Sequence, residues 1–142
     1  MRGLVNHVDL TVANPTSSLA FYEAVLGYMG YRRISAHERG YDFDRQTADG
    51  AFTSIGIMRA EGEGKLRRHD RYSPGLHHLA WTAESRADVD GLYNLLLEIG
   101  ATILDPPGDY PRYGAGYYAV FFADPDGLKL EFVHWPGHGS PG

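Results

Sequence analysis

The stretch PGLHHLAWTA at residues 74–83 repeats a pattern that first occurs near the N-terminus, in NHVDLTV at residues 6–12. Each copy places a histidine ahead of alternating apolar and small or polar residues, which is typical of a strand with one buried face. When His7 is aligned with His78, the amphipathic segments that follow, residues 14–27 and 84–100, also align. An internal repeat of this kind predicts two copies of one supersecondary unit.

Each copy continues with a helix and three further strands. The helices have capping residues at their starts, Asn14 and Ser85, and glycine stop signals at their ends. The expected strands are 4–12, 31–35, 41–45 and 51–59 in the first half, and 76–83, 102–104, 117–123 and 128–135 in the second, with a loop at 105–116. This order predicts an α+β fold of two βαβββ modules.

We expect the two sheets to form one curved, cup-shaped mixed sheet with the helices on the outside. The modules span about residues 4–60 and 75–135 of a single domain that covers residues 1–142. A linker, residues 61–74, joins the modules, and a Gly/Pro-rich tail, residues 136–142, follows them.

The composition excludes several classes of function. A net charge of −5 argues against a nucleic-acid partner, and no apolar run reaches the roughly 20 residues that span a bilayer. No signal-like segment is present at the start, so we expect a cytoplasmic protein. Four basic residues of the linker region are expected to be a solvated connector: Lys65, Arg67, Arg68 and Arg71.

The chain contains no cysteine, so a metal site would have to use histidine or oxygen ligands. His7 and His78 hold the same place in the two repeats, and strand alternation in LKLEFV points Glu131 away from the helix-packing face. Two imidazoles and one carboxylate suit one divalent ion: Fe, Mn, Zn or Ni. A lone strand histidine is more often structural, but the matched pair with Glu131 favours a metal site. His77 is one residue out of register, so it is expected to point to the opposite face.

Four motifs resemble the vicinal-oxygen-chelate superfamily, which includes glyoxalase I, fosfomycin and bleomycin resistance proteins and extradiol dioxygenases. They are HVDLTV at 7–12, LAFYEAVLG at 19–27, HLAWTA at 78–83 and DPDGLKLE at 124–131. The resemblance implies the glyoxalase/dioxygenase-like fold and a divalent metal held by His7, His78 and Glu131. It also implies a small-molecule substrate whose adjacent oxygens approach that metal.

Glyoxalase I has a fourth protein ligand, and the alignment of the two hairpin turns puts Ser54 at that place. A three-ligand site is closer to the dioxygenase pattern, and the missing fourth ligand leaves the reaction class open between a glyoxalase- or lyase-like enzyme and a dioxygenase-like enzyme. The alternative is a metal-free protein that binds or sequesters a small molecule, as in bleomycin resistance. A transferase that adds a thiol to an epoxide would need more cationic residues than Arg112.

Aromatic residues with one arginine gather before the strand of Glu131: Tyr110, Arg112, Tyr113, Tyr117 and Tyr118. We assign catalytic roles to Glu131 and Tyr113, and substrate binding to Arg112 and Tyr118, because phenols and guanidinium groups bind oxyanions. Aromatic packing of the loop is the alternative. Members of the superfamily pair their modules within a chain or across a dimer, so we also expect a homodimer, with no membrane partner.

Overall fold

The structure is a computed structural model that describes residues 2–137. The chain divides into two compact units, Met1–Arg67 and Arg68–Gly142, and the boundary falls inside the predicted linker. The single-domain assignment stays a prediction. Residues 138–142 of the predicted tail lie outside the described residues.

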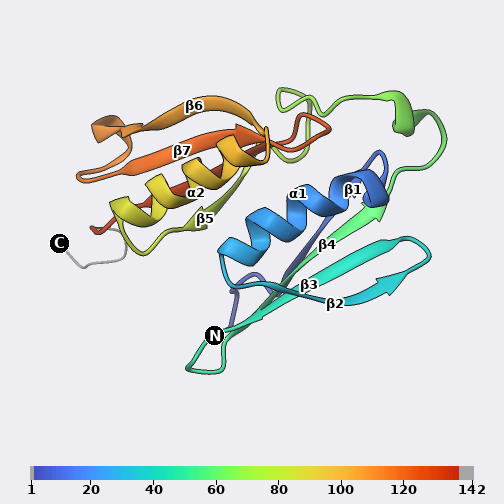
Figure 1. Cartoon of the computed structure of the whole chain (residues 1–142), viewed down its shortest axis with the longest axis horizontal. Helices are drawn as coiled ribbons and strands as arrows, with labels where there is room; N and C mark the ends of the chain where they lie inside the picture. Colours follow the sequence, from blue (N-terminus) through green and yellow to red (C-terminus); the bar gives the residue numbers. More distant parts are fainter. Residues whose placement is uncertain (1, 138–142) are drawn as a thin grey trace. The chain divides into compact units, whose positions relative to one another are not determined.

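The two units have the same order of elements, one strand, one helix and three strands (Figure 1). The first contains β1 (His7–Val12), α1 (Pro15–Tyr28), β2 (Arg32–His37), β3 (Gly40–Gln46), β4 (Phe52–Arg59) and the short 3₁₀ helix η1 (Gly62–Leu66). The second contains β5 (Leu79–Thr82), α2 (Arg86–Glu98), β6 (Thr102–Asp109), the 3₁₀ helix η2 (Pro111–Tyr113), β7 (Tyr118–Ala123) and β8 (Lys129–His134). The prediction of an α+β fold built from two βαβββ modules is therefore confirmed.

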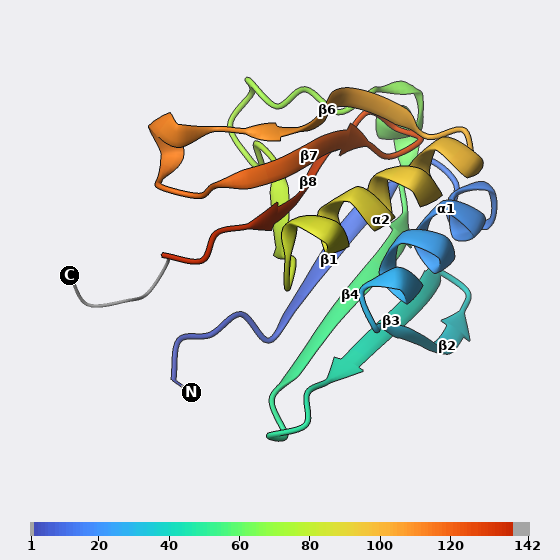
Figure 2. The ribbon, with the colours of Figure 1, turned by 60° about the vertical axis from the view of Figure 1, so that its left-hand side comes forward.

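Each module forms a mixed four-stranded sheet with its helix on one face (Figures 1 and 2). The strand orders are β1-β4-β3-β2 and β5-β8-β7-β6. The first and last strands of each module run parallel, and the other neighbours are antiparallel. A parallel pair needs a long crossover connection, which the helix and the two intervening strands supply. The face of each sheet without the helix is called its open face below.

The alternation read from the sequence fixes which residues meet the helix. In β1, Leu10 and Val12 are buried, whereas His7, Asp9 and Thr11 are exposed. This period of two is what a strand with one covered face requires. His7 therefore lies on the open face, as predicted.

Both helices begin at the predicted caps. The Asn14 side chain accepts a hydrogen bond from the Thr16 backbone N–H at 3.0 Å, and Ser85 accepts one from the Asp88 N–H at 3.0 Å. The helices then bury apolar stripes that fill the core of each unit: Tyr22, Val25 and Leu26 from α1, and Val89, Leu92 and Leu96 from α2. Among the described residues no helix is long and apolar enough to cross a membrane.

The second unit departs from the prediction in two places. β6 runs on to Asp109, through Pro106 and Pro107, where a loop was expected. Proline cannot donate to a sheet ladder, but β6 is an edge strand, and its pairing with β7 is interrupted at the prolines, between Asp105 and Gly108. The other difference is that β5 begins only at Leu79, so the residues before it are not in a strand.

β3 and β4 approach each other closely at Gly40, and substitution of this glycine tests that approach. A Cβ atom there would overlap the Ile57 carbonyl oxygen of the neighbouring strand, whereas a Cβ on Gly27 in α1 would meet nothing within 4 Å. Gly40→Ala should therefore lower the free energy of unfolding by about 1–3 kcal/mol. Gly27→Ala should raise it by about 0.5 kcal/mol, because alanine favours the helix. Urea unfolding of both variants measures this, and equal effects would contradict the close approach of the two strands.

Candidate metal centre

Glu131 is a carboxylate placed in the core of the second unit. It lies in the middle of β8, pairs with Phe121 of β7 and Ala80 of β5, and is only 2% exposed. Its neighbours Leu130 and Phe132 are buried on the helix side, so alternation turns Glu131 to the open face. A charge buried in this way is costly unless polar groups or a cation compensate it.

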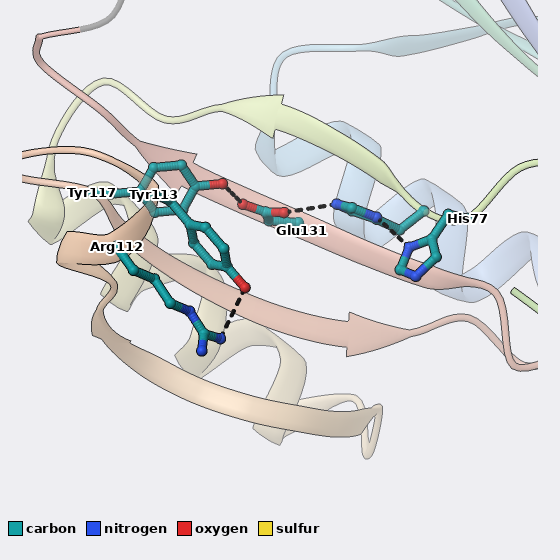
Figure 3. A network of polar contacts seen from close by, with 6 residues as sticks. His77, Arg112, Tyr113, Tyr117 and Glu131 are labelled. Carbon is teal, nitrogen blue, oxygen red and sulfur yellow. Dashed lines mark hydrogen bonds and ion pairs between the residues drawn. The ribbon is translucent and has the colours of Figure 1, made fainter. Parts of the chain in front are cut away.

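Each of the two oxygens of this carboxylate has a polar contact with one side chain (Figure 3). His78 Nε2 lies 3.1 Å from Oε1, and the Tyr117 hydroxyl donates a short hydrogen bond to Oε2. Burial raises the pKa of Tyr117, and the bond to Glu131 raises it further. Tyr117 is therefore a neutral donor that holds the carboxylate in a fixed orientation.

The predicted pair of His78 and Glu131 is thus brought together, and Tyr117 is a site residue that the sequence analysis did not select. Alternation selects it once the register of β7 against β8 is known. Counting back from Phe121, which pairs with Glu131, places Ala119 and then Tyr117 on the open face.

Tyr118 lies on the other side of the same sheet. Its ring packs under the Arg86 guanidinium at 3.9 Å, and its hydroxyl donates to Asp90 of α2 at 2.6 Å. That hydrogen bond raises the pKa of Tyr118. Arg86 also pairs with Asp109 at 2.6 Å, so these residues fasten α2 to the edge of its sheet. The structure does not bring Tyr118, predicted to bind substrate, to Glu131.

Tyr113 and Arg112 surround Tyr117 rather than contact Glu131. Arg112 donates to the Tyr113 hydroxyl at 2.9 Å, and the Tyr113 ring packs against the rings of Tyr110 and Tyr117 at 5.7 and 5.3 Å (Figure 3). Tyr113 is 47% exposed. Tyr113, the predicted catalytic tyrosine, therefore contacts Tyr117 and not the Glu131 carboxylate itself, and it lies at the exposed edge of the cluster formed by Tyr110, Tyr113 and Tyr117.

His77 does not point away from His78, and the prediction that it would do so is wrong. The two Nδ1 atoms lie 2.7 Å apart and the ring centroids 5.0 Å apart. Strand alternation does not apply here, because β5 begins only at Leu79. In such a contact one Nδ1 must carry a proton and the other must accept it, so each ring fixes the tautomer of the other.

His7 lies at the start of β1 in the first unit, where its Nδ1 is 2.9 Å from Asn6 Oδ1. Neither unit by itself gathers three His, Asp or Glu side chains in a metal-binding group among residues 2–137. The three-ligand set of His7, His78 and Glu131 stays a prediction, of which the second unit contributes two members.

Counted from the turn of each hairpin, Ser54 stands where the second unit has Glu131. Ser54 is two residues after Phe52, the first residue of β4, and Glu131 is two residues after Lys129, the first residue of β8. A serine hydroxyl is a far weaker metal ligand than a carboxylate. The first unit therefore offers no acidic ligand at this place.

The first strands of the two modules pair differently with these hairpins. His7 pairs directly with Ser54, whereas the residue paired with Glu131 is Ala80, two positions beyond His78. His78 therefore lies two positions before the strand partner of Glu131, just outside β5, and its Nε2 atom still reaches Glu131 Oε1 at 3.1 Å.

This fold and these motifs agree with the comparisons with known proteins. The family model described as the glyoxalase/bleomycin resistance protein/dioxygenase superfamily matches residues 4–132. The chain belongs to this superfamily. A structure from Bacillus halodurans, provisionally described as a glyoxalase, superposes with a TM-score of 0.78 at 31% identity over 94% of this chain and 97% of that one.

Two curated relatives of this superfamily member cover nearly its whole length. YqjT of Bacillus subtilis, of uncharacterised function, is 30% identical. The match includes 91% of this chain and 97% of YqjT. The metallothiol transferase FosB of Lysinibacillus sphaericus is also 30% identical, over 90% of this chain and 79% of its own.

The chemistry of the donor set fits a divalent ion. The site combines an imidazole nitrogen with a buried carboxylate oxygen, a pairing that Fe, Mn, Zn and Ni all accept. A cation at this place would also offset the cost of burying the Glu131 charge.

Tyr117 and Tyr113 form a matched pair for testing which tyrosine supports the site. Tyr117→Phe removes the donor to Glu131 Oε2 and should lower the free energy of unfolding of the metal-free protein by about 1–3 kcal/mol. Tyr113→Phe should change it by less than about 0.5 kcal/mol, because its side chain is exposed. Chemical denaturation measures both, and a larger effect at Tyr113 would contradict this arrangement.

Proposed function

We propose that this protein is a metal-dependent enzyme that acts on a small molecule with adjacent oxygens. His78 and Glu131 bind one divalent ion, Fe, Mn, Zn or Ni, and His7 supplies a further ligand. The observation that carries this proposal is the buried Glu131 carboxylate in contact with the His78 imidazole. Superfamily membership and the matched place of His7 in the sequence repeat support it.

His77 orients the ligand in this proposal. For His78 to bind a metal through Nε2, that nitrogen must be unprotonated, and the ring proton then lies on Nδ1. His77 Nδ1, at 2.7 Å, is in place to accept it. Ligating histidines commonly donate their second ring N–H to such an acceptor, which fixes the ring.

The remaining roles belong to Glu131 and the aromatic group. The metal, when bound, supplies Lewis-acid polarisation of the substrate oxygens. Glu131, held by Tyr117, is the group that moves a proton at the substrate. Tyr113 and Arg112 border the site and contact the substrate away from the reacting atoms.

Both a lyase- or isomerase-like reaction and ring cleavage by a dioxygenase use such a site, and the metal-free sequestering protein is the alternative. A buried carboxylate with an adjacent imidazole favours the enzymes, since a sequestering protein has no use for the pair. We also propose that the protein is cytoplasmic and forms a homodimer.

Metal titration of the purified protein tests the ligand set. Wild type should bind one equivalent of Mn, Zn or Ni, while His78→Ala and Glu131→Gln should abolish binding. His77→Ala should weaken it about 10- to 100-fold, because the ring of His78 loses its acceptor. His37→Ala, which removes a histidine paired with Asp42 in the first unit, is the control and should bind normally.

Calorimetry with folded variants provides the measurement. If wild type binds no metal after reconstitution, the enzyme proposal fails and the sequestering alternative takes its place. If His77→Ala binds as tightly as wild type, His77 has no orienting role.

A further inference from the structure

Cationic side chains lie beside the Glu131–His78 pair in the second unit. Lys129 comes two residues before Glu131 on β8, so both face the open side of the sheet. The Lys129 ammonium lies 4.6 Å from the centroid of the Phe121 ring, and Phe121 is the strand partner of Glu131. Lys129 is therefore a direct neighbour of the site along its strand.

A second cation, Arg71, lies in the loop before β5 and is linked to His78 through the rings of Tyr72 and His77. Its guanidinium lies 5.0 Å from the Tyr72 ring centroid and donates to the Tyr72 hydroxyl at 3.0 Å. The Tyr72 ring in turn packs edge-on against His77 at 5.8 Å.

This loop is a fixed part of the second unit. The His69 N–H donates to the Asp126 carbonyl at 3.0 Å, on the turn that precedes β8. Within the loop, Asp70 accepts hydrogen bonds from the Tyr72 N–H and the Ser73 hydroxyl at 3.0 and 2.8 Å. The expectation of a solvated connector is therefore wrong for Arg71, which is half-buried and packed on a structured loop.

Polar groups of this loop lack partners. Arg71 Nε and His69 Nδ1 are buried without a hydrogen-bond partner, and within residues 2–137 neither Arg71 nor Lys129 forms an ion pair. The nearest acid in sequence, Asp70, is already engaged by its own loop. Buried donors are normally satisfied, so the Arg71 Nε–H, which has no partner although it lies in a loop with further cations, is suited to bind an anionic oxygen.

We propose that Arg71, Lys129 and His69 form a subsite that binds an anionic oxygen group of the substrate, a carboxylate or a phosphate. Its role as part of a substrate site rests on the proposed function, because the reacting end would lie at Glu131 and His78. Lys129 and Glu131 are separated by two residues of extended strand, about 7 Å. The substrate is therefore a small acid whose adjacent oxygens lie a few bonds from its charged group.

Anion binding by the metal-free full-length protein tests the subsite apart from the metal. Inorganic phosphate and acetate are titrated separately, with binding followed by the NMR shifts of the histidine rings. Wild type should bind at least one of them saturably. Arg71→Gln and Lys129→Met should each weaken that binding about 10- to 100-fold, since each removes a charged donor. Lys65→Met, in the exposed η1 helix, removes the same charge elsewhere and should leave binding unchanged.

Charge-keeping variants separate binding from folding. Lys129→Arg and Arg71→Lys should bind more tightly than the neutral variants. Tighter binding of phosphate identifies a phosphate-like substrate group, and tighter binding of acetate a carboxylate. The proposal is overturned if wild type binds neither anion, if Lys65→Met weakens binding as much, or if charge-keeping and neutral variants lose it alike. Metal titration of the same variants shows whether they still bind the metal when they no longer bind the anion.

Discussion

The arrangement of the second unit depends on the burial of one carboxylate. Glu131 is 2% exposed in the middle of a sheet, and its two oxygens are held by an imidazole and a phenol from different parts of the chain. A strand position so well covered would normally carry an apolar residue, because burying an ionised group costs several kcal/mol. The neighbours compensate this cost, and Tyr117 in particular stays a neutral donor because it too is withdrawn from water. Such an expensive placement is typical of a functional site.

The sequence predicted the fold closely because its signals were periodic and local. The repeat of two histidine strands, the caps at Asn14 and Ser85 and the buried stripes of both helices all appear in the structure. Alternation in LKLEFV was enough to place Glu131 on the open face. Where strand geometry ends, alternation failed: His77 and His78 precede β5, and their rings turn toward each other. Tyr117 and Tyr118 are adjacent, and their sequence alone does not show which of them contacts Glu131. The register of β7 against β8 decides this.

The contacts of Arg71 and Lys129 change the balance among the candidate reactions. From the sequence, a thiol transferase was disfavoured because Arg112 was the only cation near the site, and Arg71 was grouped with exposed linker residues. In the structure, the loop that contains Arg71 lies against the turn before β8. The His69 N–H there donates to the carbonyl of Asp126, a residue distant in the sequence. No local pattern predicts such a contact. An acidic substrate, as proposed here, is compatible with a transferase as well as with a lyase.

Anomalous diffraction from crystals grown with Mn or Zn tests the central claim most directly, because it locates the ion without relying on activity. The account predicts one strong peak within bonding distance of both His78 Nε2 and Glu131 Oε1, about 2.0–2.2 Å for zinc. A third ligand at that peak would also show whether His7 joins the site, and from which subunit. A peak elsewhere, or none at Glu131 while Tyr117 still donates to its carboxylate, would contradict the account.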